Sequence, residues 1–402
     1  MTRHQTIALS VAIALALLSV TAAQPQQQAE PTQAQQATEP KVQPEKKASR
    51  REPVKVVDIA PETATHLEGE SLKVEFKRLT ALRIRDDDSL LASDADAKVI
   101  KIISPAGKQV GAIELPFAPE ALDIAADGTL YCGGEGQLAK LSADGRVLKM
   151  ETVPDEVAPT ATEQQPPEPP KPAPKAKETG DESKPASTAK EATEDRKPAP
   201  PRRRRKPRPK RISGIAVTDR DIFVAFGSGW SLGSKSKLYR FDLELQNPQA
   251  LAEGLRGCCQ RCDIKSREGV VYLAENSAHR VVLYDREGNV LKKWGERGRD
   301  DLKTFGACCN PMNICFDGQG VLYTTESGLG RVKRYTPDGE FIDLVGYVGT
   351  ERFWHGSGLA ASCSNMAIAV TGDGRRVYVM DYKHNRIRVL EKKATEADVE
   401  AR

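Results

Sequence analysis

The chain has 402 residues, of which 39% are hydrophobic and 5% aromatic, and its net charge is +4 at pH 7. The chain is only mildly basic, and the position of the basic residues matters more than the size of the excess. Beyond the N-terminal region no segment is apolar enough to span a bilayer, so the sequence predicts no transmembrane segment.

Residues 1–23 are typical of a secretory signal peptide. Arg3 and His4 precede a short apolar run at residues 6–20, and the small residues Ala22 and Ala23 stand at the expected cleavage site. The run is too short and wrongly flanked to be a membrane anchor. We therefore expect an exported protein, periplasmic or extracellular, in a compartment where disulfides form. A nucleic-acid partner is not expected for such a protein.

Three segments lack the side chains needed for a core. Residues 24–70 are rich in Gln, Pro, Glu and Lys, residues 153–210 are rich in Pro, Lys and Glu, and residues 394–402 form a short charged tail. The first two bury too little apolar surface to offset the entropy of ordering, so they are predicted to be disordered. The excess of basic residues is concentrated at residues 202–211. This run is either a contact for an anionic surface or simply a solvated linker end.

The rest of the chain repeats one pattern six times. Each unit has an Ile-containing strand, a turn of the Asp-Gly type and a second strand ending in Tyr or Val, as in Ile124 to Tyr131 with its turn at Asp127-Gly128. Asp-Gly between alternating apolar residues is the strongest short-range hairpin signal. The second half of a unit is an acidic residue followed five positions later by an arginine that opens another strand: Glu275 and Arg280, Glu326 and Arg331, Asp381 and Arg386.

This pattern resembles the NHL-repeat family, whose units read as an Ile-Ala-Val-Asp-like strand, a Gly turn, a Tyr-Val strand and an Asn-x-Arg-Ile strand. The resemblance covers about residues 72–393 and implies an all-β, six-bladed β-propeller of the NHL/SMP-30-like kind. Certain exported bacterial proteins of this type resemble the chain in a second feature, the Cys-Cys-Asn-Pro loop at residues 308–311. The resemblance is specific for the fold and not for an activity.

The predicted blades occupy residues 78–115, 117–150, 211–253, 254–298, 305–349 and 357–393. The sixth blade lacks an outer strand of its own, and residues 71–77 have the alternation of a strand that could close the ring. The propeller is thus predicted to consist of residues 71–152, with the closing strand and blades one and two, and residues 211–393, with blades three to six. The disordered insert then leaves the ring between blades two and three.

Three similar loops, here called the sulfur loops, open the last three blades at residues 256–264, 306–314 and 361–368. Alignment on the Ile of each inner strand places Cys262, Met312 and Met366 in equivalent positions, where the other blades have Leu82, Leu122 and Ser213. The remaining loop cysteines are Cys258, Cys259, Cys308, Cys309 and Cys363. A radially symmetric fold should bring these residues to one half of a single channel mouth.

The sulfur loops have three competing explanations. Thiolate and thioether groups are soft ligands that favour copper, zinc or iron–sulfur chemistry. Exported cysteines normally oxidise, which favours structural disulfides. The third explanation is packed thiols. A bridge between adjacent cysteines would be strained, because neighbouring Cα atoms are only about 3.8 Å apart.

A polar ring is expected beside the sulfur residues. The residues that directly precede the aligned Ile include Arg83, Asp123, Asp263 and Asn313. Under a gluconolactonase-like alternative the last three would supply oxygen ligands to calcium. No glutamate occupies this ring, and Arg83 stands where a carboxylate would be expected.

The fold does not by itself identify an activity. We expect a binding or scaffold module that uses its channel face, rather than an enzyme, with another exported protein or a cell-envelope polymer as its partner. The alternatives are a redox or metal-binding protein that uses the cysteine and methionine cluster, and a metal-dependent hydrolase of the gluconolactonase type.

Overall fold

The computed structural model describes residues 54–55, 58–157, 210–227, 235–258, 261–349, 353–354 and 364–394. The predicted signal peptide, nearly all of the predicted insert and the charged tail lie outside these residues. So do most of the predicted N-terminal disordered segment and two cysteines of the sulfur loops, Cys259 and Cys363.

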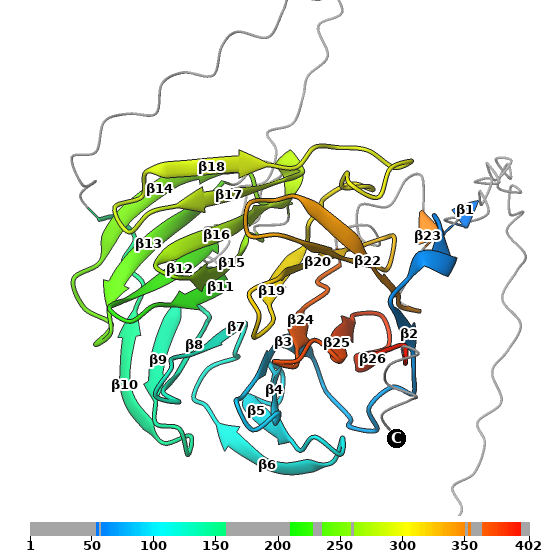
Figure 1. The fold of residues 1–402 in the computed structure, drawn as a ribbon. Helices are drawn as coiled ribbons and strands as arrows, with labels where there is room; N and C mark the ends of the chain where they lie inside the picture. The colour runs from blue at the N-terminus through cyan, green and yellow to red at the C-terminus, as the bar shows by residue number, and fades with distance from the viewer. Residues whose placement is uncertain are drawn as a thin grey trace, which may run out of the picture. The chain divides into compact units, whose positions relative to one another are not determined.

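Six four-stranded antiparallel sheets form the described fold, with their first strands gathered around a common centre (Figure 1). The first three sheets consist of β3 (Leu79–Ile84), β4 (Leu90–Asp94), β5 (Val99–Ile103) and β6 (Gln109–Glu114); β7 (Ala121–Ile124), β8 (Leu130–Gly134), β9 (Gln137–Leu141) and β10 (Val147–Thr152); and β11 (Arg211–Val217), β12 (Asp221–Gly227), β13 (Ser236–Asp242) and β14 (Gln249–Leu255).

The fourth and fifth sheets consist of β15 (Asp263–Arg267), β16 (Val270–Glu275), β17 (Arg280–Tyr284) and β18 (Val290–Trp294), and of β19 (Asn313–Phe316), β20 (Leu322–Glu326), β21 (Arg331–Tyr335) and β22 (Phe341–Tyr347). The sixth contains β24 (Ile368–Val370), β25 (Arg376–Asp381), β26 (Arg386–Lys392) and β2 (His66–Glu68). Each sheet corresponds to one predicted blade. The predicted six-bladed propeller is therefore confirmed.

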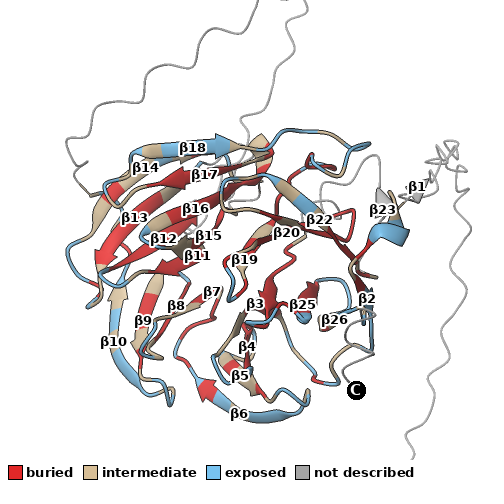
Figure 2. Cartoon of the chain, in the orientation of Figure 1, coloured by how far each residue is buried: buried red, intermediate tan, exposed pale blue. Residues whose placement is uncertain are grey.

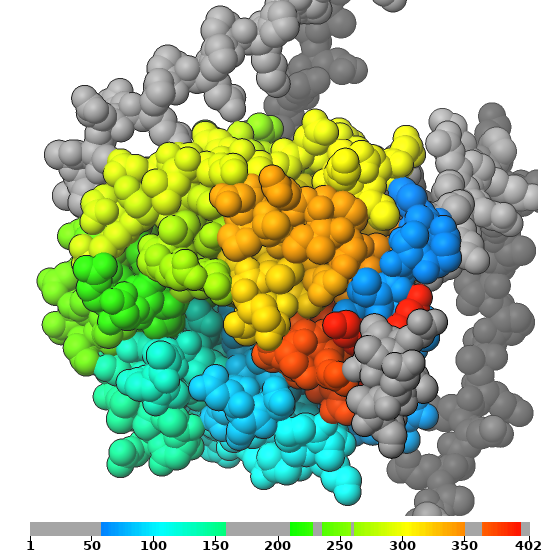
Figure 3. All heavy atoms as spheres, in the orientation of Figure 1, coloured from blue at the N-terminus to red at the C-terminus, as the bar shows by residue number. Residues whose placement is uncertain are grey.

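The ring is closed by β2, which pairs with β26 with His66 opposite Lys392. Figure 3 shows the N-terminal residues, in blue, lying against the last blade, in red. Residues 71–77, which were predicted to close the ring, form no strand. The strand that closes it lies just before them in the sequence. The alternation of that segment reflects the packing of Val74 into the core between blades six and one rather than pairing in a ladder.

The segment before β2 is also ordered, although residues up to 70 were predicted to be disordered. A short 3-10 helix, η1 (Pro61–Thr63), precedes β2. The Tyr347 hydroxyl donates to Ile59 O at 2.8 Å and accepts from Ile59 N at 2.7 Å. These contacts to blade five compensate for the low apolar content of the segment, which sequence composition alone did not reveal. A small ladder also joins β1 (Val54–Lys55) to β23 (Phe353–Trp354).

The predicted turns form for an identifiable reason. In the β7–β8 hairpin, Asp127 Oδ1 accepts from Thr129 N at 2.9 Å, and Gly128 has a φ of 83°. The aspartate therefore accepts a backbone N–H of the turn, and the glycine adopts a left-handed conformation that a side chain would disfavour.

The core consists of apolar clusters between neighbouring blades. Figure 2 shows that the inner strands are mostly buried, whereas β6, β10 and β18 at the outside are largely exposed. The second strand of blade three, β12, is buried along its whole length because sheets cover both of its faces. Within the described residues no helix is both long and apolar enough to cross a membrane.

Candidate functional site

Carboxylates at the ends of the second strands fix the loops that open the blades. Glu326, the last residue of β20, accepts from Gly306 N at 2.8 Å, and Glu275, the last residue of β16, accepts from Arg256 N at 2.9 Å. Asp94 does the same in blade one, accepting from Arg78 N at 2.8 Å. The acidic residue in the repeat is therefore the anchor of the opening loop, and the sulfur loops of blades four and five are anchored in this way.

The arginine of the repeat pairs with the same carboxylate. Arg280 lies opposite Glu275 across the β16–β17 hairpin, and Arg331 lies opposite Glu326 across β20–β21. Their ion pairs measure 2.5 and 2.8 Å. The five-residue spacing of acid and arginine in the sequence thus reflects one strand end, a tight connection and the start of the next strand.

The aligned sulfur residues lie in the blade cores. Cys262, Met312 and Met366 are only 0%, 1% and 2% exposed, and none of them belongs to the wall of the central cavity. Met312 and Met366 share one hydrophobic cluster with Cys309, and Cys258 packs against that cluster. The sulfur loops therefore approach one another, but their sulfur atoms largely contribute to packing rather than to a channel rim.

Burial makes the described core thiols poor nucleophiles and poor metal ligands, since the reactive form is the thiolate. Desolvation raises the pKa of Cys262 to about 12, and it also raises the pKa values of Cys132 and Cys315. Cys132 and Cys315 pack among apolar residues, as small hydrophobes do. The described residues contain no group of three or more His, Cys, Asp or Glu side chains arranged to hold a metal ion.

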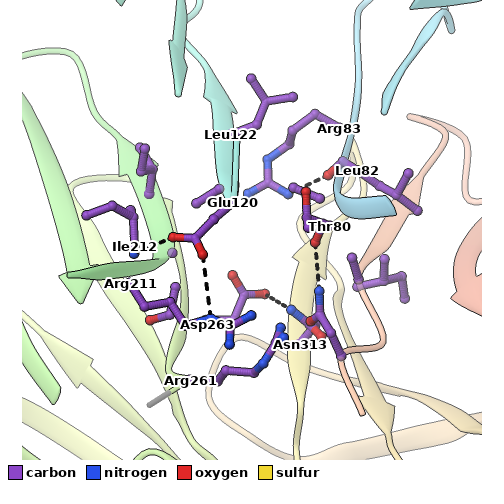
Figure 4. Close-up of a pocket in the computed structure, with 18 residues that line it drawn as sticks. Thr80, Leu82, Arg83, Glu120, Leu122, Arg211, Ile212, Arg261, Asp263 and Asn313 are labelled. Atoms are coloured by element: carbon purple, nitrogen blue, oxygen red, sulfur yellow. Dashed lines mark hydrogen bonds and ion pairs between the residues drawn. The ribbon is translucent and has the colours of Figure 1, made fainter. Parts of the chain in front are cut away.

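A central cavity of about 30 Å³ lies where the inner strands of all six blades meet (Figure 4). Three of the four residues predicted for the polar ring line it, namely Arg83, Asp263 and Asn313. The fourth, Asp123, is not part of this wall but accepts from Arg83 Nε at 2.8 Å. Leu82, Leu122 and Ser213 also belong to the wall.

Both aspartates of this ring are occupied by basic partners. Asp263 accepts from Lys265 Nζ at 3.0 Å and from Ile314 N at 2.9 Å, while Asp123 binds Arg83 and Val217 N. Calcium requires six to eight oxygen ligands. Because an ammonium and a guanidinium group already neutralise these carboxylates, the residues present do not fit the calcium site of the hydrolase alternative.

The charges of this ring are coupled. Burial opposes the charge of Arg83, but Asp123 and Asp263 outweigh it and raise the pKa of Arg83 above its usual value. Burial, with Arg83 nearby, lowers the pKa of Lys265. Lys265 was missed by the sequence reasoning, although the spacing Asp263-x-Lys265 within a strand places both side chains on one face.

A second polar layer was also missed. Arg211, Arg261 and Glu120 line the cavity, and Figure 4 shows their side chains grouped on one side of it. Glu120 Oε2 accepts from Ile212 N at 3.0 Å, and Arg211 Nε lies 4.0 Å from Glu120 Oε1. Desolvation raises the pKa of Glu120. The position of Arg211 in the sequence could have revealed it, because Arg211 is both the last residue of the basic run and the first residue of the inner strand of blade three.

Searches against protein families and curated proteins found no match. Among solved structures, the chain resembles XC5397 of Xanthomonas campestris, described as a gluconolactonase, with a TM-score of 0.51 and 12% identity over 85% of this chain and 95% of that one. A luciferin-regenerating enzyme gives a TM-score of 0.50 and 10% identity over 81% and 95% of the two chains. Likeness at such low identity shows the fold alone. The chain is a six-bladed β-propeller of the architecture found in these enzymes.

Proposed function

We propose that the protein is a binding module whose channel mouth contacts a polyanionic polymer of the cell envelope, with phosphate or carboxylate groups. One observation carries the proposal: the last residue of the basic run at 202–211, Arg211, forms part of the cavity wall. Arg261 contributes a second guanidinium group to the same wall.

The charge balance at the mouth supports this assignment. In the ring of Arg83, Asp123, Asp263 and Lys265, each carboxylate has a basic partner. Among the described residues of this layer there are two arginines, Arg211 and Arg261, and one carboxylate, Glu120. The excess at the mouth is therefore positive, and a repeating polyanion can contact the mouth and the basic run together.

The dimensions of the cavity favour binding over enclosure of a substrate. At about 30 Å³ it accommodates roughly two water-sized groups. A single phosphate or carboxylate group can approach its arginines, but a sugar-sized molecule cannot be enclosed. The described wall contains no histidine, and its aspartate is held by Lys265 and Asn313.

Fluorescence anisotropy with labelled polyphosphate and poly-glutamate, over a range of salt concentrations, tests the proposal. We expect binding that weakens steeply as salt rises, because counterions are released from the polymer. Arg211→Gln and Arg261→Gln should each weaken binding about fivefold, since one basic residue near an anionic surface contributes about 1 kcal/mol. Replacing residues 202–205 by glutamine should weaken it further.

Arg220→Gln is the matched control. Arg220 is exposed and lies at the opposite end of the β11–β12 hairpin from Arg211, where its partner among the described residues is its neighbour Asp219. This variant should bind like the unaltered protein. Equal losses in Arg220→Gln and Arg211→Gln would show that the polymer does not recognise the channel mouth. Absence of binding to either polymer at low salt would overturn the proposal as a whole.

A further inference from the structure

The outer strand of blade two, β10, concentrates exposed apolar side chains. Val147, Leu148 and Met150 are 40%, 50% and 37% exposed. Each of the other outer strands presents at most one large apolar side chain that is comparably exposed: Leu67 in β2, Val110 in β6, Leu291 in β18 and Ile342 in β22. An exposed apolar patch of this kind marks a surface that another molecule can cover.

The strand is also the edge of its sheet. In the order β10-β9-β8-β7, it pairs with β9 on one side and with no described strand on the other. Figure 2 shows β10 at the outside of the ring and largely exposed. Backbone N–H and C=O groups along such an edge can hydrogen-bond to a strand of another chain. The edge and its apolar side chains therefore form a docking surface for a strand.

The charges of β10 select the strand that can pair there. Lys149 and Glu151 flank Met150 and point to the same side of the strand. Of the six outer strands described, only β10 contains both a lysine and a carboxylate residue. An antiparallel copy of β10 centred on Met150 places each Lys149 opposite Glu151 of the other copy. Two copies of β18 centred on Lys292 would instead place two lysines opposite each other.

The contacts of Lys149 within its own blade favour such a partner. Lys149 lies directly opposite Lys140 in the β9–β10 ladder, and like charges in this position destabilise a sheet. Lys140 binds Glu244 at 2.5 Å, whereas Lys149 lies 3.6 Å from Glu151 of its own strand. Glu151 of a second copy would supply a further carboxylate to Lys149 on the side away from Lys140.

We propose that the protein forms a symmetric dimer in which the β10 strands of two copies pair antiparallel about Met150. The two blades then join into one continuous sheet, with four strands from each copy. The ladder is regular from Lys149 to Thr152, so this part of the strand can pair along both edges. A lysine in an edge strand normally discourages pairing with foreign strands. Here it is matched by a carboxylate two residues further along the same strand, which favours a second copy of this chain.

Sedimentation velocity of the full-length protein tests the proposal at concentrations from about 1 to 200 μM. We expect a weak dimer with a dissociation constant in the micromolar range, because one strand pair buries less area than a standard interface. Lys149→Glu and Glu151→Lys should each weaken the dimer about tenfold, since each sets two pairs of like charges opposite one another. The contact lies on the outside of the ring, so it does not depend on the proposed polymer binding.

The two variants also test the register through each other. Mixed in equal amounts, Lys149→Glu and Glu151→Lys should form a heterodimer, and the double variant with both substitutions should dimerise again, because opposite charges face each other in both cases. Lys292→Glu is the matched control, since Lys292 is an exposed lysine of the outer strand β18. It should dimerise like the unaltered protein. A monomer at the highest concentration, equal weakening by Lys292→Glu and Lys149→Glu, or failure of the mixture to associate would overturn the proposal.

Discussion

Replacement of Glu326 by glutamine tests whether the repeat carboxylate holds blade five together. Its side chain is fully buried and binds Arg331 at 2.8 Å, Lys333 at 2.6 Å and Gly306 N at 2.8 Å. Arg331 and Lys333 are themselves 1% and 0% exposed. Burial disfavours the charge of Glu326, but the two cations lower the pKa of its carboxyl below the usual value.

Glu326→Gln preserves the shape of the side chain and removes its charge, which leaves two buried cations without an anionic partner. Loss of one partner from a buried ion pair costs about 3–5 kcal/mol. One kcal/mol corresponds to about 2–4 °C in a large domain, so we expect the melting temperature to fall by roughly 10 °C. Glu326→Gln combined with Lys333→Met restores the original buried charge and should recover part of this loss.

Urea unfolding followed by intrinsic fluorescence, together with calorimetry, measures these differences. Asp338→Asn is the control, because Asp338 is in the same blade but 77% exposed and pairs with Lys292 only at 3.5 Å. Its loss should be less than about 1 kcal/mol. The reasoning is refuted if Glu326→Gln is no more destabilising than Asp338→Asn. It is also refuted if Lys333→Met destabilises the Glu326→Gln variant as much as it destabilises the unaltered protein.

Three further predictions concern ring closure and the thiols. Burial lowers the pKa of His66, so the stability that its neutral form supports is present above the unfolded pKa of about 6.5 and declines as the pH falls from there towards the folded pKa. In His66→Gln the free energy of unfolding in urea should therefore depend less on pH between pH 7.5 and 5. An unchanged pH dependence contradicts this. Deletion of residues 1–69 removes β2 and should speed hydrogen exchange of the β26 amides, whereas deletion of residues 1–50 should not. Equal protection of these amides in the two deletion variants would show that β2 does not close the ring. At pH 8 a thiol reagent should label Cys308 in the folded protein but Cys262, with a pKa of about 12, only after unfolding; comparable rates in mass mapping would contradict the described burial.

Much of the fold could be predicted because its signals are local. Asp127-Gly128 specifies a hairpin through its own turn chemistry, and the spacing of Glu326 and Arg331 reflects one strand connection. The closing strand could not be located in this way. Its place at His66–Glu68 depends on contacts with β26 and on Tyr347, which lie about 280 to 320 residues further along the chain.

The candidate site was predicted only in part for a different reason. Alignment of the blades identified equivalent positions, and Arg83, Asp263 and Asn313 do line the cavity. Alignment could not reveal which residues face the channel, because equivalent positions differ between blades: Leu82 and Arg83 both line the cavity in blade one, whereas in blade four Asp263 lines it and Cys262 does not. For this reason Cys262 was expected at the rim, and Arg261 beside it was overlooked.

In blades four and six, however, residues that line the cavity do alternate with buried sulfur residues. Arg261 and Asp263 line the cavity, while Cys262 between them is fully buried; Asn365 and Ala367 line it, while Met366 is 2% exposed. Packing behind a polar channel wall requires adaptable apolar side chains, and sulfur-containing residues meet that need. Cys308 does not fit this explanation, because it is exposed and has no such packing role. The exposed Cys308, rather than the symmetric set of sulfur residues, is therefore the position at which a role in chemistry should be sought.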